Sequence, residues 1–259
     1  MAVRVEVAAP LATVTLDRPA ARNAIQRAMW AELAEVFARL ADDASVRVVI
    51  LRGAGDRAFS AGADIGEFRT KMISKELARD YWRVVDAANS AVERCPKPVI
   101  AMVAGFALGA ALPLVCACDV RIAAAENARF GVPAARIGLT LGLEDARRLV
   151  GAVGGSWARD ILITGRLFDA NEALAIGLVQ RVVPLARLEA ETHTLAHRIA
   201  EGAPLALRQA KQNVDLILRD PALTSVDREE WSIAWAGSRD FVEGIEAFFA
   251  GRRPEFRGE

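Results

Sequence analysis

The sequence predicts an α/β fold followed by a C-terminal region built of helices. Apolar runs typical of buried strands alternate with helical spacing up to about residue 184, and this order predicts helices layered on a sheet. Beyond Pro184 no strand pattern is evident, and helical spacing continues to the tail. We therefore expect one α/β core that carries a helical appendage.

The N-terminal part of the chain predicts a hairpin, a helix and a buried strand. Residues 3–7 and 12–16 alternate apolar and polar side chains, as the two strands of a hairpin do. Asn23 can cap the helix that follows, with Gln26 as its reciprocal partner. Residues 46–51 form a continuous β-branched run, which predicts a strand buried on both faces. The apolar positions of the helix are Ile25, Met29, Leu33, Val36, Phe37 and Leu40.

The stretch between Lys97 and Asp119 has no charged side chain, and we expect the rest of the chain to be organised around it. Its length would suit a membrane span. However, glycines and a proline interrupt it, and no basic flank or aromatic belt frames it. We predict a buried strand over residues 99–103, a glycine-bearing turn, a helix over residues 110–118 and a strand over residues 120–123.

Helical spacing and capping residues predict the remaining elements. Asp169 and Glu172 form a capping box for a short helix that Gly177 closes, and a strand over residues 178–183 follows. Aromatic residues continue at helical spacing from Trp231 to Phe249, so we expect the late helices to pack on the core or on another copy of the chain. The other expected helices cover residues 75–95, 146–150, 188–200 and a segment that begins at Pro204.

Composition and motif content exclude several classes of function. The 33 basic and 33 acidic residues cancel, which removes the electrostatic argument for nucleic acid or an anionic membrane surface. Three cysteines argue against a disulfide framework, and no signal peptide is evident, so we expect a cytoplasmic protein. Cys116 and Cys118 lack a second pair, and His193 and His197 lack a third ligand, so we predict no metal site. No phosphate-binding loop and no nucleophile elbow are present.

Two glycine-rich turns remain as candidate chemistry, and each follows a buried strand. They are Ser60-Ala61-Gly62-Ala63-Asp64 and Gly105-Phe106-Ala107-Leu108-Gly109-Ala110. If one backbone N–H group from each turn converged on a single point, the pair would stabilise an oxyanion by hydrogen bonding. Glycine turns after strands are also common in proteins without such a site.

Six segments, in order along nearly the whole chain, resemble the crotonase superfamily, which contains the enoyl-CoA hydratases and isomerases. The segments are LDRPAARNAI (16–25), AFSAGADI (58–65), PKPVIAMVAGFALGAA (96–111), CDVRIAAAENARFGVPAARIGL (118–139), ITGRLFDANEALAIGLVQRVV (163–183) and FVEGIEAFFAGRRPEF (241–256). The resemblance implies a spiral of ββα units over residues 1–190 and a C-terminal helical oligomerisation region over residues 191–259. It also implies a trimer or dimer of trimers that binds an acyl-CoA thioester, with coenzyme A as part of the substrate and no separate cofactor.

The resemblance also implies site residues, position by position. The N–H groups of Ala63 and Ala110 would donate to the thioester oxygen, with Gly109 and Gly142 beside the substrate. Ala110 stands where the family usually has glycine, and the added methyl group could crowd the thioester. The segments that hold the nucleotide end of coenzyme A match Arg22, Ala61, Asp64 and Ile65. Asp64 could instead only cap the helix that follows its turn.

The chain departs from the hydratase pattern at both catalytic acids. Hydratases carry a glutamate four residues after the first glycine of their GGG turn and another directly after the F-G-x-P segment, where this chain has Pro113 and Ala134. Syn hydration needs two carboxyl groups to hold and activate water. Ordinary hydration is therefore not supported, and an isomerase that uses the second glutamate is weakened as well.

Glu144 and Asp145 are the candidate replacement acids, because they lie in the next loop. Adjacent residues point about 100° apart on a helix, so at most one should face the pocket. Both could instead only complement the dipole of the following helix. The sequence leaves open isomerisation, decarboxylation, thioester hydrolysis and another lyase step, and also a catalytically silent acyl-CoA-binding oligomer.

Overall fold

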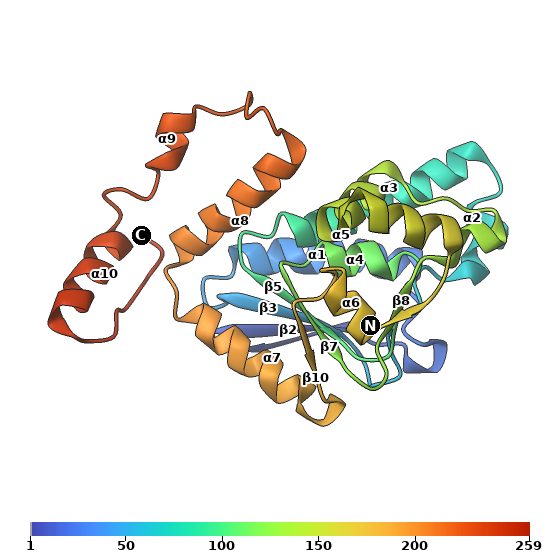
Figure 1. Ribbon diagram of the computed structural model, residues 1–259, viewed down its shortest axis with the longest axis horizontal. Helices are drawn as coiled ribbons and strands as arrows, with labels where there is room; N and C mark the ends of the chain where they lie inside the picture. Colours follow the sequence, from blue (N-terminus) through green and yellow to red (C-terminus); the bar gives the residue numbers. More distant parts are fainter. Residues whose placement is uncertain (1) are drawn as a thin grey trace.

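The computed structural model describes residues 2–259 and shows two sheets, helices on both faces of the larger one, and a helical extension at one side (Figure 1). We call residues 204–259 the C-terminal arm. In Figure 1 the arm lies beside the core at α8, and α9 and α10 extend away from it. The predicted α/β class with a C-terminal helical region is confirmed.

The larger sheet has six strands in the order β1-β2-β3-β5-β7-β10. β1 and β2 are antiparallel, as predicted for a hairpin, and the remaining neighbours are parallel. The predicted strand over residues 178–183 is shorter, because the amide of Val179 bonds to the carbonyl of Ala173 and so closes the preceding helix. The strands are β1 (Val3–Ala8), β2 (Leu11–Leu16), β3 (Val48–Gly53), β5 (Val99–Val103), β7 (Val120–Ala124) and β10 (Arg181–Val183).

A second sheet has the order β4-β6-β8-β9 and was not predicted as a sheet from the sequence. Its strands are two or three residues long, too short to give an alternating pattern. Parallel pairing of β4 with β6 and of β6 with β8 places the two glycine-rich turns next to each other. These strands are β4 (Ala58–Ser60), β6 (Phe106–Leu108), β8 (Arg129–Gly131) and β9 (Phe168–Asp169).

Ten α-helices and three short 3-10 helices occupy the rest of residues 2–259. The α-helices are α1 (Arg27–Asp42), α2 (Phe68–Lys71), α3 (Lys75–Glu93), α4 (Ala111–Cys116), α5 (Leu143–Thr164), α6 (Ala170–Ala175), α7 (Leu185–Ala200), α8 (Pro204–Arg219), α9 (Arg228–Ser232) and α10 (Arg239–Ala250). The 3-10 helices are η1 (Pro19–Ala21), η2 (Ile65–Glu67) and η3 (Pro133–Ile137). Within residues 2–259 we find no helix with the length and apolar character that a bilayer crossing requires.

The central strands β2, β3, β5 and β7 of the larger sheet are buried on both faces, and their alternate residues point to opposite sides. On one face, residues such as Val49 and Ala101 pack in the same cluster as the apolar side chains of α1 and α3. On the other face, residues such as Ile50 and Ile100 pack with Leu188 and other residues of α7. The predicted boundary between residues 190 and 191 falls inside α7.

The first helix is not capped by Asn23, contrary to the prediction. Asn23 has a positive φ of 54°, and its side chain accepts from the Arg18 amide at 3.0 Å and donates to the carbonyl of Ala58 at 2.7 Å. The side chain therefore holds the turn after β2 against β4. Helix α1 begins at Arg27, whose amide donates to the Glu67 carboxylate at 2.7 Å, so a residue far along the chain caps it.

Helix α5 is much longer than the predicted segment 146–150. It runs from Leu143 to Thr164, with a break at Gly154, where φ is 74°. The glycines at 151, 154 and 155 lower helix propensity, which is why the pattern after residue 150 did not predict a helix. Burial of Leu149, Val153 and Ile161 in the core stabilises the helix in spite of them.

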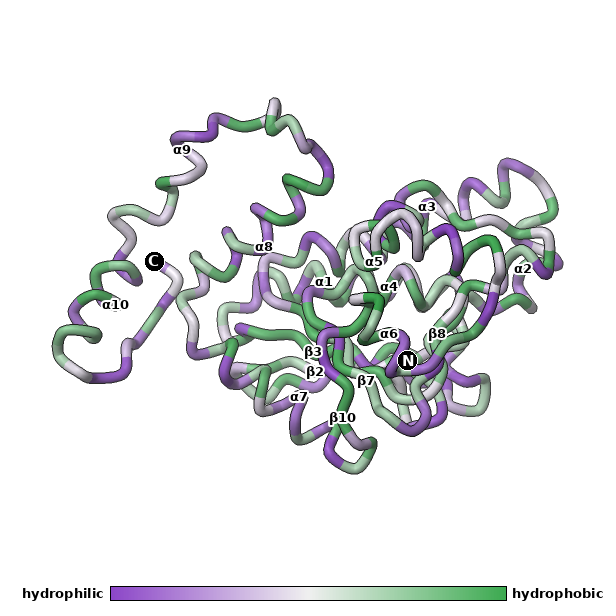
Figure 2. Tube along the Cα trace, in the orientation of Figure 1, coloured by the Kyte–Doolittle hydropathy of each residue, from purple (hydrophilic) through white to green (hydrophobic). Residues whose placement is uncertain are grey.

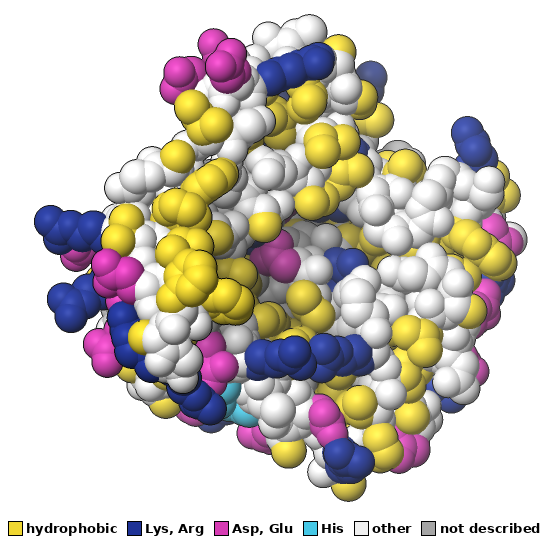
Figure 3. Space-filling view, turned by 60° about the vertical axis from the view of Figure 1, so that its left-hand side comes forward, with side chains coloured by type: hydrophobic (Ala, Val, Ile, Leu, Met, Phe, Trp, Pro, Cys, Tyr) yellow, Lys and Arg dark blue, Asp and Glu magenta, His cyan; other side chains and the backbone are white. Residues whose placement is uncertain are grey.

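The C-terminal arm leaves large hydrophobic side chains exposed. Hydrophobic and hydrophilic residues alternate along α8 and α10 (Figure 2), and hydrophobic side chains gather on the arm in the view in which it faces forward (Figure 3). Phe248 and Phe249 are 78% and 82% exposed, so these side chains are not packed on the core. Packing of the arm on another copy of the chain stays a prediction.

Ion pairs join the arm to the core across a cavity of about 400 Å³. Lys211 contacts Asp119 at 2.9 Å, and Arg219 contacts Glu93 at 2.7 Å. Because Arg219 is one of several cations around Glu93 and is partly exposed, we expect Arg219→Gln to lower the free energy of unfolding by about 1 kcal/mol. Urea denaturation measures this change. Arg208→Gln, on the same helix, should have no measurable effect, and equal losses in both variants would contradict the prediction.

Candidate active site

The two glycine-rich turns meet at the end of the second sheet. Ala58 pairs with Phe106 and Ser60 with Ala107, so both chains run side by side into their turns. The turn after β4 is tied to the N-terminal segment, because the Ala61 amide bonds to the carbonyl of Arg22 at 2.9 Å. The sequence predicted two separate turns of this kind, and the sheet brings them together.

The amide of Ala63 has no acceptor among residues 2–259. Ala63 forms a parallel bridge with Ile25, in which the Ile25 amide bonds to the Gly62 carbonyl and the Asp64 amide bonds to the Ile25 carbonyl, at 2.8 and 2.9 Å. Because successive peptide groups of an extended chain point to opposite sides, the N–H of Ala63 points away from Ile25.

Gly62 brings this turn against the other one. Its φ is 95°, and a Cβ atom here would lie 2.5 Å from the carbonyl oxygen of Leu108 and 3.1 Å from the amide nitrogen of Ala110. Any side chain would therefore collide with the second turn, so glycine is required for the close approach. The residue before Ala63 thus lies in contact with Ala110.

The amide of Ala110 likewise has no acceptor among the described residues. Ala110 is the N-cap of α4, with φ −64° and ψ −13°, and N–H groups at this end of a helix have no intrahelical partner. Gly109 before it has a positive φ of 56°, and its own amide bonds to the carbonyl of Gly131 at 2.9 Å. Two unpaired N–H groups therefore lie on adjoining turns.

The residues predicted to hold coenzyme A lie around the first turn. Arg22 is in the left-handed region, and its guanidinium lies 5.8 Å from the centre of the Phe106 ring. Asp64 caps η2 by accepting from the Gly66 amide at 3.1 Å, and its other oxygen pairs with Arg18 at 2.9 Å. Ile65 is exposed beside it. The capping role that the sequence left open for Asp64 is therefore observed.

Pro113 and Ala134, the positions that the family resemblance aligns with the hydratase glutamates, come from different elements. Pro113 is buried in the first turn of α4, and Ala134 lies in η3, partly buried against the core. Gly142 is the N-cap of α5, where its carbonyl accepts from the amide of Ala146 at 2.9 Å. Both positions therefore carry apolar side chains.

Glu144 and Asp145 point in different directions, as their adjacency on a helix predicts. The Glu144 side chain is 52% exposed and pairs with Arg147 at 3.0 Å. The Asp145 side chain is 6% exposed, and its Oδ1 accepts from Arg148 and Asn89, each at 2.9 Å. Burial raises the pKa of Asp145, although Arg148 and Asn89 act in the opposite direction. Only Asp145 faces the interior.

The charge of Asp145 also acts on a group of α4. Burial raises the pKa of the Cys116 thiol to about 11, and the negative charge of Asp145 adds to this rise, while Arg121 opposes it. Cys116 stands three residues after Pro113, so the two side chains share a helix face. The charge of Asp145 is therefore felt on the face of α4 that carries Cys116 and Pro113.

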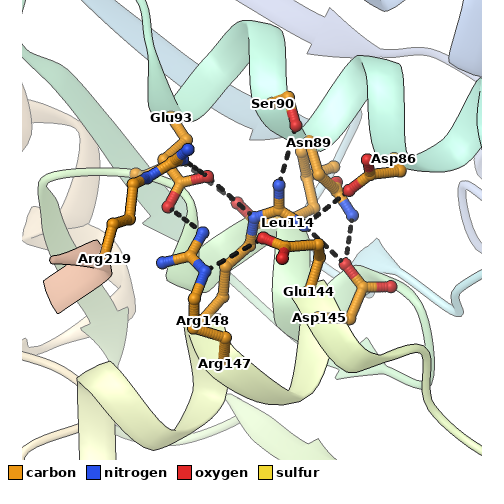
Figure 4. Close-up of polar contacts among 11 residues, drawn as sticks. Asp86, Asn89, Ser90, Glu93, Leu114, Glu144, Asp145, Arg147, Arg148 and Arg219 are labelled. Atoms are coloured by element: carbon orange, nitrogen blue, oxygen red, sulfur yellow. Dashed lines mark hydrogen bonds and ion pairs between the residues drawn. The ribbon is translucent and has the colours of Figure 1, made fainter. Parts of the chain in front are cut away.

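A network of charged side chains surrounds Asp145 (Figure 4). Arg148 is 1% exposed and contacts Glu93 at 3.1 Å, Asp86 at 3.1 Å and Asp145 at 2.9 Å. Glu93 also accepts from Arg147 at 2.6 Å. Burial alone would raise the pKa of Glu93, but the surrounding arginines outweigh burial and hold it below its ordinary value. The network joins α3 and α5, and Arg219 extends it to α8.

Sequence reasoning missed Asn89, Glu93 and Arg148. The available signal for Asn89 was an amide on the apolar face of a predicted helix, between Val85 and Val92. Paired arginines after Glu144 and Asp145 gave no spacing that identifies a partner, because Glu93 lies more than 50 residues earlier. Among residues 2–259 no group of acids, histidines and cysteines is arranged to hold a metal ion.

Comparisons with known proteins agree with this architecture. The profile of the enoyl-CoA hydratase/isomerase family matches residues 6–259. A crotonyl-CoA hydratase from Syntrophomonas wolfei is 35% identical over 95% of this chain and 94% of its own length. An (E)-benzylidenesuccinyl-CoA hydratase from Thauera aromatica is 34% identical over the full length of both chains. The crystal structure of an enoyl-CoA hydratase/carnithine racemase from Magnetospirillum magneticum, 40% identical, superimposes with a TM-score of 0.95 over 100% of this chain and 96% of that one.

Proposed function

The chain belongs to the enoyl-CoA hydratase/isomerase family, and on this premise we propose that it binds an acyl-CoA thioester and stabilises its enolate between the amides of Ala63 and Ala110. The two unpaired N–H groups on adjoining turns carry the proposal. An enolate oxygen bears more negative charge than the thioester carbonyl, so fixed donors favour the transition state over the ground state. The names of the relatives, which include coenzyme A thioester hydratases, support the substrate class.

The reaction that we propose is proton transfer at carbon, not hydration. Hydration needs a second acid–base group to deliver water. Pro113 and Ala134 are apolar, and of the two candidate replacement acids only Asp145 is buried. One carboxylate can remove a proton from the α-carbon of a β,γ-unsaturated thioester, which forms a conjugated dienolate, and can return that proton to the γ-carbon, which leaves an α,β double bond. Such a sequence isomerises a double bond with one acid–base group.

The coenzyme A portion would lie along the first turn, near Arg22, Ala61 and Ile65. Asp64 would act through the backbone there, because both of its carboxylate oxygens already have partners within the chain. The exposed aromatic side chains of the C-terminal arm support self-association of the chain. A trimer or a dimer of trimers is the state that the family resemblance implies.

Ala110→Pro tests the proposal directly, because it removes the unpaired N–H group of residue 110. Proline has no N–H, and the φ of Ala110, −64°, already suits its ring, so the fold should tolerate the change. Loss of one oxyanion donor is expected to lower kcat by about 10²–10³-fold. The measurement is deuterium uptake from D₂O into a panel of saturated and unsaturated acyl-CoA thioesters, followed by mass spectrometry.

Ala110→Gly keeps the donor and is the matched control. Proline and wild-type enzymes with equal rates would contradict the role of this amide. A catalytically silent acyl-CoA-binding oligomer is the second candidate, favoured by the engagement of Asp145 Oδ1 with Asn89 and Arg148. Tight binding of thioesters without exchange or turnover of any of them would support that candidate.

A further inference from the structure

Asn89 is a buried amide on the apolar face of α3, and it contacts Asp145 directly. Its Nδ2 donates to Asp145 Oδ1 at 2.9 Å. Its own Oδ1 is buried and has no hydrogen-bond partner in the described part of the chain. A buried polar group without a partner is unfavourable, so this position would ordinarily be filled by an apolar residue like its neighbours Val85 and Val92.

The two donors to Asp145 meet on a single oxygen. Arg148 Nη1 also donates to Oδ1, at 2.9 Å, and its guanidinium is held in place by Glu93, Asp86 and Ser90. No hydrogen bond to Asp145 Oδ2 exists among residues 2–259. The carboxyl group is thus fixed by one oxygen and free at the other.

We propose that Asn89 is a positioning residue, which together with Arg148 confines the exchangeable proton of Asp145 to Oδ2. This inference rests on the proposed function, in which Asp145 is the working carboxyl. A guanidinium and an amide NH₂ can only donate, so a proton on Oδ1 would face two donors and displace at least one of them. No donor in the described part of the chain faces Oδ2, so the proton that moves to or from the substrate sits on this oxygen.

Of the two donors to Asp145, Arg148 is charged and Asn89 is uncharged, and the other groups nearby are charged or titratable. On α3, Asp86 and Glu93 share Arg148 with it, and on α5 Glu144 pairs with Arg147. The remaining nearby groups are the Cys116 thiol on α4 and Arg219 on α8, which reaches the network through Glu93. Replacement of Asn89 changes no formal charge, so its effect on Asp145 reports the hydrogen bond itself.

Asn89→Leu tests the inference, because leucine has nearly the same shape and cannot donate. The Nδ2 bond stabilises the ionised carboxylate, so its loss should raise the pKa of Asp145 by about one unit. The measurement is a ¹³C NMR titration of protein labelled at the aspartate carboxyl carbons, with the Asp145 signal assigned by its absence in Asp145→Asn. Ser90→Ala, which removes a partner of Arg148 but no contact to Asp145, should shift the pKa by much less.

An unchanged or lowered pKa in Asn89→Leu would overturn the inference. A lowered pKa would mean that the Asn89 carbonyl faces Asp145 and accepts a proton from its Oδ1. Asn89→Ala provides the same titration if the leucine variant does not fold. The titration needs no substrate, so a raised pKa with no exchange of any thioester would contradict the proposed function but confirm the hydrogen bond from Asn89 to the Asp145 carboxylate.

Discussion

Asp145→Asn is expected to lower the rate of proton exchange at the acyl carbon by about 10²–10⁴-fold, because an amide cannot take up the proton that a carboxylate removes. The replacement should leave the fold intact. The asparagine carbonyl can still accept from Asn89 Nδ2 and from Arg148 Nη1, which are the donors that Oδ1 has now. The loss should therefore appear in kcat, with KM for the thioester little changed. Deuterium uptake at saturating thioester measures it.

Two further variants show whether Asp145 acts as an acid–base group or only supports the ion pairs around Arg148. Asp86→Asn alters another carboxylate partner of Arg148 that is half exposed and does not touch Asp145. Glu144→Gln changes the other acid that the sequence singled out, which lies at the surface with Arg147. Asp145→Asn with a loss no greater than that of Asp86→Asn would show that Asp145 only supports the structure.

The sequence located the two glycine-rich turns, but it did not identify the side chains that surround Asp145. Ala63 and Ala110 became candidate donors through the family resemblance, and the turns in which they lie are marked by Gly62 and Gly109. Their side-by-side placement could not be derived from the residues alone, since β4 and β6 are too short to show a periodic pattern.

Tertiary contacts decide whether the side chain of each candidate acid points into the protein or toward solvent. Glu144 and Asp145 were equivalent in the sequence, and the pairing of α5 with α3 decides which one is buried. The partners that make burial of Asp145 possible, Asn89 and Arg148, belong to helices that start about 70 residues apart. Periodicity predicted α3 well, but it cannot identify which polar residue on an apolar face has a partner.

The same contacts make Arg148 the residue on which the α3–α5 interface depends most. Its side chain is 1% exposed and contacts carboxylates of Glu93 and Asp145, which are themselves 9% and 6% exposed. We expect Arg148→Met to lower the free energy of unfolding by about 3–5 kcal/mol, because removal of one partner leaves buried charge uncompensated. Glu93 keeps Arg147 and Arg219, so most of the penalty should fall on Asp145. Denaturant unfolding at neutral pH measures the loss.

A pH dependence follows from this explanation. Without Arg148 the pKa of Asp145, already raised by burial, should rise further. The folded state then binds the proton more tightly than the unfolded state, whose aspartate pKa is about 3.9, so stability falls as pH rises through the folded pKa. The loss of unfolding free energy caused by Arg148→Met should accordingly shrink as the pH is lowered toward the pKa of aspartate in the unfolded chain. An equal penalty at all pH values would contradict the buried-charge explanation.

A double-mutant cycle separates the lost ion pair from lost packing. Arg148→Met combined with Asp145→Asn removes both the cation and the carboxylate that it leaves behind, so the combined loss should be smaller than the sum of the two single losses. A coupling of about 1–3 kcal/mol is expected for contacting buried groups. Arg148→Lys should be more stable than Arg148→Met but less stable than the wild type. The planar guanidinium contacts several partners at once, and a single ammonium group cannot replace all of these contacts. Additive losses in the cycle would instead assign the effect to the packing of the arginine side chain.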